Sequence, residues 1–402
     1  MARKNKNSSF GPGFLVTAAF IGPGTVTSCS MAGARFGYAL VYALVFAVVT
    51  TLILQEMTGR LSLGTGKDLG QSLRAFTQNP LAKFLFIILT LSSITLGCAA
   101  YEAGNIIGGS LGLEMVTGMP QKYWVFLISF IAGIVLIQKK YRLVERFLIF
   151  LVSLMSLSFL TTVIIVQPDL ISIFQGLIPS FPQKSVYLVL ALVGTTVVPY
   201  NLFLHSSAVK EKWKTQDSLK HVKKDLLLSI GLGGIVSASV VITSAVAFYQ
   251  KGIPLEKGTQ LAAQLEPLFG PLTHFLFGVG FFAAGLSSAI TAPYAAAFAS
   301  SGILGWKKSQ DSTGFQCIWI GVLVVGFVVS LFKLNPLTVI VFAQVANGLI
   351  LPVASVFLLL VLNDRGKMGF LANNLKQNIA GGIIILIVSL LGLWNIARLF
   401  LK

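Results

Sequence analysis

The sequence predicts an all-α membrane protein of eleven transmembrane helices, two of which are broken near the middle of the membrane. Of the 402 residues, 55% are hydrophobic and 11% are charged, whereas about 25% of the residues in a soluble protein are charged. The apolar residues lie in blocks of about 18–25, the length that an α-helix needs to cross a hydrocarbon layer about 30 Å thick. Glycine and proline interrupt two of these blocks at their centres.

The apolar blocks follow one another along the chain without a soluble domain between them. In a window of about 19 residues, they centre near 13–33, 38–57, 82–112, 122–138, 143–167, 185–209, 226–249, 269–303, 315–332, 337–362 and 378–399. We therefore expect a single membrane domain over residues 1–402. The block at 269–303 is long enough to contain a re-entrant segment.

The basic residues fall mainly on one side of the predicted membrane. When alternate loops are assigned to opposite sides, 22 of the 30 Lys and Arg residues lie on the side of the N-terminus. Cytoplasmic loops are enriched in Lys and Arg, so we expect a cell-membrane protein with a cytoplasmic N-terminus and, after eleven spans, an external C-terminus. The net charge of +17 then belongs to short loops beside the lipid bilayer. It does not indicate nucleic-acid binding, and we expect a monomer.

Two other classes of function find no support in the sequence. Cys29, Cys98 and Cys317 lie far apart in apolar segments and lack metal-ligand spacing, so we expect them to be packing residues. No nucleophile–base pair and no phosphate-binding loop before a soluble helix is present. The sequence therefore predicts neither an enzyme nor a bound cofactor.

The two interrupted blocks predict a substrate site. Gly22, Pro23 and Gly24 break the first block, and Pro199 followed by Asn201 breaks the sixth, since proline removes a helix donor and glycine tolerates non-helical torsions. A single such break usually means only a kink. Two breaks in corresponding positions are typical of transporters that bind cargo between discontinuous helices.

The positions of the breaks also predict an inverted repeat. The first break opens spans 1–5 and the second opens spans 6–10, which gives repeats at about 10–167 and 185–362. The block at 378–399 is then an extra helix.

Several polar residues lie at membrane depth outside the breaks. Glu102 is the clearest buried carboxylate, and such a group is a functional candidate because it is costly in lipid; a hydrogen-bonded packing role is the alternative. Glu56 lies at a span end, where we expect water or a basic partner. Gln344 and Asn347 share a helical face and either line the cavity or bond a neighbouring helix. His205 follows the second break and fits a polar network.

Several motifs resemble those of the Nramp family of divalent-metal transporters. They occur in family order at residues 11–16 (GPGFLV), 23–24 (PG), 32–38 (AGARFGY), 66–69 (GKDL), 199–206 (PYNLFLHS), 285–288 (GLSS), 344–345 (QV) and 363–365 (NDR). The resemblance implies a leucine-transporter-like fold of eleven or twelve spans and transport by alternating access.

The chain departs from the family pattern at the residues that hold the metal. The family carries Asp-Pro-Gly-Asn in the first break, where this chain has Gly22 to Thr25, so the carboxylate is absent. The methionine that supplies the family's soft sulfur aligns with Val198. Soft ligands select transition metals, whereas hard ions take carboxylate, carbonyl and water oxygens. The resemblance therefore implies a divalent-cation transporter whose transition-metal ligands have been replaced.

The residues that couple transport to protons in the family are also changed. The family's third-span Asp and Glu align with Glu102 and Asn105, and its sixth-span His aligns with Tyr200. The ninth span lacks the family's Arg pair around Cys317. Related magnesium transporters lose the methionine and the coupling residues as well, but they keep the first-span acid. We expect no proton coupling of the usual kind.

Three hypotheses remain open. A weakly bound, largely hydrated cation such as magnesium could be held by carbonyl and hydroxyl oxygens, or a small anion or zwitterion could meet amide donors and helix dipoles at the breaks. A non-transporting sensor is the third, although no long soluble tail is present. The expected substrate-binding residues are Gly22, Thr25, Thr195, Val198, Tyr200, Asn201 and Gln344, and the candidates for coupling or gating are Glu102, Asn105 and His205.

Overall fold

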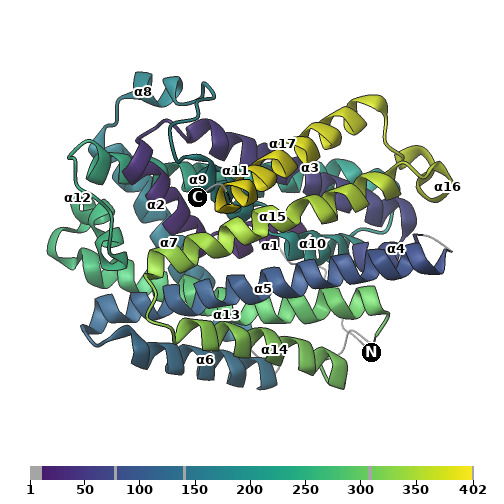
Figure 1. The fold of residues 1–402 in the computed structure, drawn as a ribbon, viewed down its shortest axis with the longest axis horizontal. Coiled ribbons are helices and arrows are strands. Elements are labelled where there is room, and N and C mark those ends of the chain that lie inside the picture. Colours follow the sequence, from purple (N-terminus) through teal and green to yellow (C-terminus); the bar gives the residue numbers. More distant parts are fainter. Residues whose placement is uncertain (1–10, 77–78, 139–141, 307–309, 401–402) are drawn as a thin grey trace.

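The computed structural model describes residues 11–76, 79–138, 142–306 and 310–400. Within these ranges the secondary structure is helical, with no β-strand. Most of the long helices run along one direction, which is the long axis of the molecule (Figure 1). Some basic residues on which the predicted orientation rests lie outside the described ranges: Arg3, Lys4, Lys6, Lys139, Lys140, Lys307, Lys308 and Lys402.

The first half of the chain forms five spans, the first of them broken. The spans are α1 (Pro12–Phe20) with α2 (Pro23–Phe36), α3 (Val41–Thr65), α5 (Pro80–Thr117), α6 (Gln121–Gln138) and α7 (Arg142–Val166). Two short helices lie in the connections, α4 (Leu69–Arg74) and α8 (Leu170–Gln175). The sequence motif at 66–69 supplies the start of α4, because the Asp68 carboxylate accepts a hydrogen bond from the Gln71 amide and caps the helix.

The second half repeats this order. Its spans are α9 (Val186–Thr196) with α10 (Pro199–Lys212), α11 (Leu219–Ser244), α13 (Thr273–Leu304), α14 (Thr313–Ser330) and α15 (Pro336–Leu362), and α17 (Leu375–Phe400) follows them. The short elements are α12 (Glu266–Phe269), α16 (Arg365–Met368), a π-helical turn η2 (Ala245–Tyr249) and the 3₁₀ turns η1 (Gln216–Ser218), η3 (Gly258–Leu265), η4 (Gly270–Leu272) and η5 (Gly369–Leu371).

The described helices account for eleven spans. Ten are long and apolar enough to cross a membrane, with α9 and α10 taken as one. The pair α1 and α2 adds the eleventh, because its halves of 9 and 14 residues are each too short to cross about 30 Å of hydrocarbon at about 1.5 Å per residue. The predicted number of spans and the two broken helices are confirmed.

Helices α5 and α13 pack at the centre of the bundle through glycine. A methyl group added at Gly112 would lie 2.5 Å from the carbonyl oxygen of Gly278, and one added at Gly285 would lie 2.3 Å from the amide nitrogen of Gly109. Because neither helix carries a side chain at these points, the two backbones approach closely, as small residues allow in membrane proteins. Both helices also border the first break, because a methyl group at Gly108 of α5 would lie 2.3 Å from Cβ of Pro23 and one at Gly22 would lie 2.9 Å from the hydroxyl of Ser288 on α13.

One possibility raised by the sequence is not realised, and one prediction is wrong. Residues 273–304 form one continuous helix, α13, and it contains Pro293 without a re-entrant segment. The start of the block, at 269–272, belongs to α12 and the turn η4. Cys29 and Cys98 are buried as expected, but Cys317 is exposed on α14. An apolar side chain on the outside of a membrane bundle meets lipid, so hydrophobicity alone does not place a residue in the core.

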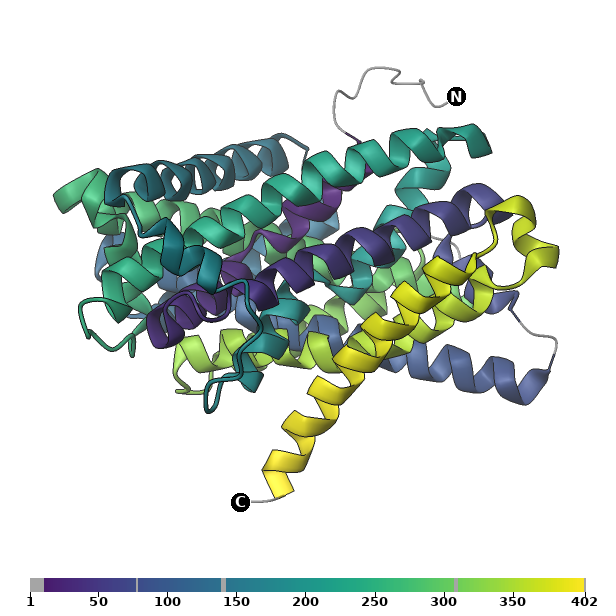
Figure 2. The same ribbon diagram turned by 90° about the horizontal axis from the view of Figure 1, so that it is seen from above.

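Helix α17 lies at the edge of the bundle. It crosses the other helices at a steep angle, and its C-terminal end projects away from them (Figure 2). Leu386, Leu390 and Leu393 on this helix are exposed, which is the pattern of a helix with a lipid-facing side. It packs beside α15, α9 and α3.

Candidate functional site

The two helix breaks have closely similar backbone geometry. Ile21 and Val197 follow the last residues of α1 and α9 with ψ angles of 80° and 79°. Gly22 and Val198 come next in extended conformations, and a proline then opens each following half-helix. Proline has no amide hydrogen to donate and its fixed φ suits a helix start. The two broken helices therefore stop and restart at Pro23 and Pro199, the prolines from which the breaks were predicted.

A direct hydrogen bond joins the two breaks. The hydroxyl oxygens of Thr25 and Thr195 lie 2.9 Å apart, and both side chains are buried. The Thr25 hydroxyl also donates to the carbonyl of Phe20 across its own break. A hydroxyl has a single proton to donate, so Thr195 is the donor to Thr25. Two residues that were expected to bind substrate thus bind each other in this conformation.

Helix α15 contributes an amide beside the first break. A methyl group at Gly24 would lie 2.3 Å from Nε2 of Gln344, so the glutamine packs directly on the α2 backbone. Its Nε2 donates to the carbonyl of Ile340 at 3.3 Å, while its Oε1 has no hydrogen-bond partner among the described residues. On the other side, a methyl group at Gly22 would lie 2.9 Å from the hydroxyl of Ser288 on α13.

The second break presents one polar side chain with both of its groups free. The Asn201 side chain is 1% exposed, and neither Oδ1 nor Nδ2 has a hydrogen-bond partner in the described part of the chain. An unpaired buried amide is costly, which marks Asn201 as a site for water or cargo. The neighbouring Tyr200 packs edge-on against Tyr101, with ring centroids 6.0 Å apart, and Val198 is fully buried.

Two adjoining cavities lead from these breaks along α1. One has a volume of about 320 Å³ and includes Asn201 in its lining. The other has a volume of about 370 Å³ and reaches Ile21 at the first break. Phe14, Ile149 and Ser287 line both cavities. We call the two together the vestibule; it runs between α1, α7 and α13 toward the side of the bundle where α10 ends.

The charged side chains in the vestibule are acidic. Glu145 on α7 and Glu211 on α10 line it, and its described lining residues include no Lys or Arg. The deeper part, near Ile21, is apolar except for hydroxyl groups such as those of Thr17 and Ser288. An exposed carboxylate such as that of Glu211 raises the local concentration of cations and lowers that of anions.

The three candidates for coupling or gating lie in two different places. Glu102 is fully buried on α5, and its side chain lies against α14, where a methyl group at Gly326 would be 2.5 Å from its Cγ. Asn105 donates to Glu102 Oε2 at 3.4 Å. His205 lines the vestibule, and its Nδ1 lies 3.0 Å from the Thr58 hydroxyl of α3. Glu102 does not line either vestibule cavity.

The structure thus brings part of the expected set together. Thr25 and Thr195 touch, Gly22 and Gln344 flank the first break, and Asn201 faces the vestibule. The sequence reasoning missed Ser288, Tyr101, Glu145 and Glu211. Ser288 lies in the GLSS motif and Tyr101 directly precedes Glu102, so the sequence offered a signal by which both residues could have been identified. The two glutamates lie near helix ends, where nothing in the sequence separates them from other interfacial charges.

The described residues contain no group of three or more His, Cys, Asp and Glu side chains placed to hold a metal ion. Polar contacts near the breaks come instead from hydroxyl and amide groups. Hydroxyl and amide groups carry no fixed charge, and they bind hydrated ions or small polar molecules.

Known proteins share sequence and fold with this chain. The chain is 30% identical over 379 residues to a divalent metal cation transporter, MntH, of Mesorhizobium japonicum, covering 90% of this chain and 82% of the relative. It resembles the crystal structure of a manganese transporter from Eremococcus coleocola with a TM-score of 0.77 at 22% identity, covering 99% of this chain and 91% of the other.

A more distant structure extends the likeness in fold. MhsT, solved in complex with L-phenylalanine, superposes with a TM-score of 0.61 at 16% identity, covering 94% of this chain and 98% of the other. The leucine-transporter-like fold, with helices broken in the first and sixth spans, is therefore confirmed. The model of the natural resistance-associated macrophage protein-like (Nramp) family matches residues 13–398, so the chain belongs to the Nramp family.

Proposed function

We propose that this protein is a secondary transporter that moves a divalent cation by alternating access, and that the cation keeps most of its water. Magnesium is the representative of this class, because it is hard and dehydrates reluctantly. The cargo site lies between the two helix breaks and is reached through the vestibule.

The direct bond between Thr25 and Thr195 is the observation that carries this proposal. In the bound state the two hydroxyls separate and turn their oxygens toward the hydrated ion, with Oδ1 of Asn201 and Oε1 of Gln344 as further acceptors. These are neutral oxygens, so they can replace outer water molecules but cannot offset the cost of stripping a dication. Weak binding and poor preference for soft metals follow from this set.

A small anion or zwitterion is the second candidate. Amide donors at the starts of α2 and α10 and the Nδ2 group of Asn201 support it. The vestibule argues against it, because the charged side chains among its described lining residues are Glu145 and Glu211. An anion would pass two carboxylates before reaching the breaks.

Transport is proposed to proceed without the proton coupling expected of the family. Glu102 lies between α5 and α14, away from the vestibule, and Asn105 occupies the second acidic position of the family pattern. His205 is better placed for gating, since its bond to Thr58 ties α10 to α3. A pH-sensitive dye inside proteoliposomes tests this directly: cation entry without internal acidification is expected.

The remaining features are proposed from sequence and fold. The N-terminus lies in the cytoplasm, the C-terminus lies outside, and the transporter acts in the cell membrane as a monomer. The repeats span about 10–167 and 185–362 within one domain. Under this orientation the vestibule opens to the cytoplasm.

The test is flux into liposomes that contain the purified full-length chain. Magnesium uptake is followed with an entrapped indicator, in parallel with uptake of chloride, nitrate and glycine, and protein-free liposomes provide the baseline. Magnesium flux above baseline, without flux of the anions or glycine, is expected. Flux of an anion or glycine without magnesium would reverse the order of the two candidates.

A further inference from the structure

A groove separate from the vestibule lies between α3, α11 and α17. It has a volume of about 480 Å³. One end of the groove is polar and is formed by Glu56, Arg60, Lys223, Asn374, Lys376 and Gln377. These residues come from the end of α3 and from the beginnings of α11 and α17, so they lie at the same level of the bundle. That level is where spanning helices meet the membrane surface.

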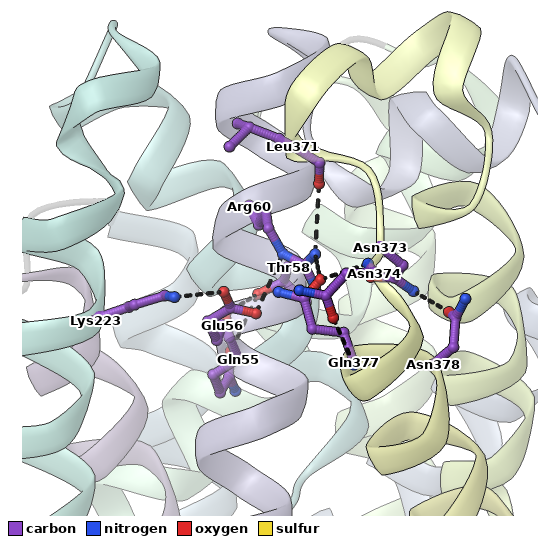
Figure 3. Close-up of polar contacts among 10 residues, drawn as sticks. All are labelled: Gln55, Glu56, Thr58, Arg60, Lys223, Leu371, Asn373, Asn374, Gln377 and Asn378. Carbon is purple, nitrogen blue, oxygen red and sulfur yellow. Dashed lines mark hydrogen bonds and ion pairs between the residues drawn. The ribbon is translucent and has the colours of Figure 1, made fainter.

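Arg60 is the buried centre of the polar end (Figure 3). Its side chain is 2% exposed, yet Nη2 has no partner among the described residues. Its Nη1 donates to Oε1 of Gln377 at 2.8 Å and to the carbonyl of Leu371 at 3.4 Å. Its Nε lies 3.3 Å from Oε2 of Glu56. A buried guanidinium with an unused donor group is costly unless an acceptor reaches it.

The polar end carries excess positive charge. Three cations line it, Arg60, Lys223 and Lys376, against the single carboxylate of Glu56. That carboxylate is already shared, because Lys223 Nζ lies 3.5 Å from Oε1 while Arg60 takes Oε2. The net charge of these lining side chains is therefore +2. An anion that fits this end would accept hydrogen bonds from Arg60 and meet two lysines.

The other end of the groove is apolar and faces outward. Leu52 and Ile53 of α3 and Leu227 of α11 line it, and Leu227 is 62% exposed. Leu52 precedes Arg60 by eight residues, which is about 12 Å along the helix. The apolar wall thus runs from the charged level into the hydrocarbon layer. A soluble anion leaves this wall uncovered, whereas an acyl chain covers it.

We propose that the groove binds an anionic phospholipid, with its phosphate at Arg60, Lys223 and Lys376 and an acyl chain along Leu52 and Leu227. Basic residues at the membrane surface attract anionic headgroups, and charge-assisted bonds to phosphate suit a guanidinium. The bound lipid links α17 to α3 and α11. This proposal is independent of the cargo, because none of these residues lines the vestibule.

The full-length chain in a non-ionic detergent is the sample for the test. Native mass spectrometry measures apparent affinities for phosphatidylglycerol, for phosphatidylcholine with the same acyl chains, for glycerol phosphate and for inorganic phosphate. We expect phosphatidylglycerol to bind at least tenfold more tightly than each of the other three. Equal binding of phosphatidylcholine would mean that the groove is only apolar, and equal binding of either soluble phosphate would mean that it takes a soluble anion. Both results overturn the proposal.

Paired lysine substitutions locate the site. Lys223→Gln with Lys376→Gln should lower phosphatidylglycerol affinity ~30-fold, since each lysine near the surface contributes about 1 kcal/mol, or about fivefold. The control is Lys220→Gln with Lys224→Gln, which removes the same charge from exposed positions outside the groove. The control should stay within twofold of the unsubstituted protein. If both pairs lose affinity equally, the lipid is held by general surface charge and the proposed site is wrong.

Discussion

The hydroxyls of Thr25 and Thr195 are 2.9 Å apart and connect the two helix breaks across 170 residues of sequence. Because Thr25 donates to the Phe20 carbonyl, its oxygen is the acceptor and Thr195 is the donor. The link is neutral, so it can open without separating charges. We interpret it as the closed state of a site whose oxygens turn to the cargo when the two half-helices move apart.

Removing the Thr195 hydroxyl should impair transport more than it impairs folding. Thr195→Val deletes one buried hydrogen bond, which lowers the free energy of unfolding by about 1 kcal/mol, and it also removes one acceptor for the cargo. We expect magnesium uptake to fall ~10-fold in proteoliposomes. Thr196→Val is the matched control, since that buried hydroxyl bonds the Leu192 carbonyl within its own helix. Similar uptake by the two variants would remove Thr195 from the cargo site.

Restoring the family's ligands should create a transition-metal site. Gly22→Asp with Val198→Met adds a carboxylate and a soft sulfur at the two breaks, and both favour cadmium and manganese. Gly22 has a φ of −131°, which any residue can adopt, and only the Ser288 hydroxyl is close enough to require a shift. We expect calorimetry to detect cadmium binding in this variant.

The control for that variant keeps the bulk and removes the ligands. Gly22→Asn with Val198→Leu has similar volume but neither charge nor sulfur, so cadmium binding should be absent. Failure of the Asp and Met pair to bind cadmium in a folded protein would mean that Gly22 and Val198 do not face the cargo.

A substitution at Asn201 tests whether the cargo is a cation or an anion. Asn201→Asp places a carboxylate at the vestibule end of the second break with almost no change in shape. Opposite charges attract within a few ångströms, even at the surface-like dielectric of a wet site. We therefore expect at least about tenfold tighter magnesium binding by calorimetry. Tighter binding of an anion, or weaker binding of magnesium, would contradict a cationic cargo.

Asp225 should control how far the vestibule opens. Its Oδ2 accepts a hydrogen bond from the amide of Gly13 at 2.6 Å, which holds the start of α1 against α11. Asp225→Ala should release that end, and a cysteine at Ser287, which lines the vestibule, should react ~10-fold faster with a maleimide. The exposed Cys317 is first changed to alanine to remove background labelling.

Asp225→Asn is the control for this labelling experiment. Asparagine keeps an acceptor oxygen for the Gly13 amide, so labelling at position 287 should remain near the original rate. If Asp225→Ala and Asp225→Asn accelerate labelling equally, charge and not the hydrogen bond holds α1 in place.

Local chemistry made the breaks and the spans predictable. Pro23 and Pro199 cannot donate to a helix ladder, so each break could be located within a residue or two. The long apolar blocks gave the spans for the same reason, because backbone groups in lipid must be satisfied within a helix.

Contacts between distant segments were not predictable from one sequence. Nothing in the sequence around Gly13 indicates that its amide bonds the carboxylate of Asp225. Likewise, nothing around Thr25 indicates that the Thr25 hydroxyl bonds Thr195 and not the substrate. Hydropathy also cannot show which side of a helix faces outward, since lipid and protein core are both apolar. For that reason the prediction that Cys317 is a packing residue was wrong. Glu102 could be recognised as buried, but its contact with α14 depends on the rotation of α5.

The central claim is that the cargo site uses neutral oxygens and has lost its preference for soft metals. Calorimetry on the purified chain, with cadmium and magnesium titrated separately in the same buffer, tests it most directly. We predict weak binding of magnesium, with cadmium within about threefold of it, since hard neutral oxygens offer cadmium no soft ligand. Micromolar cadmium binding at least a hundredfold tighter than magnesium would contradict the account.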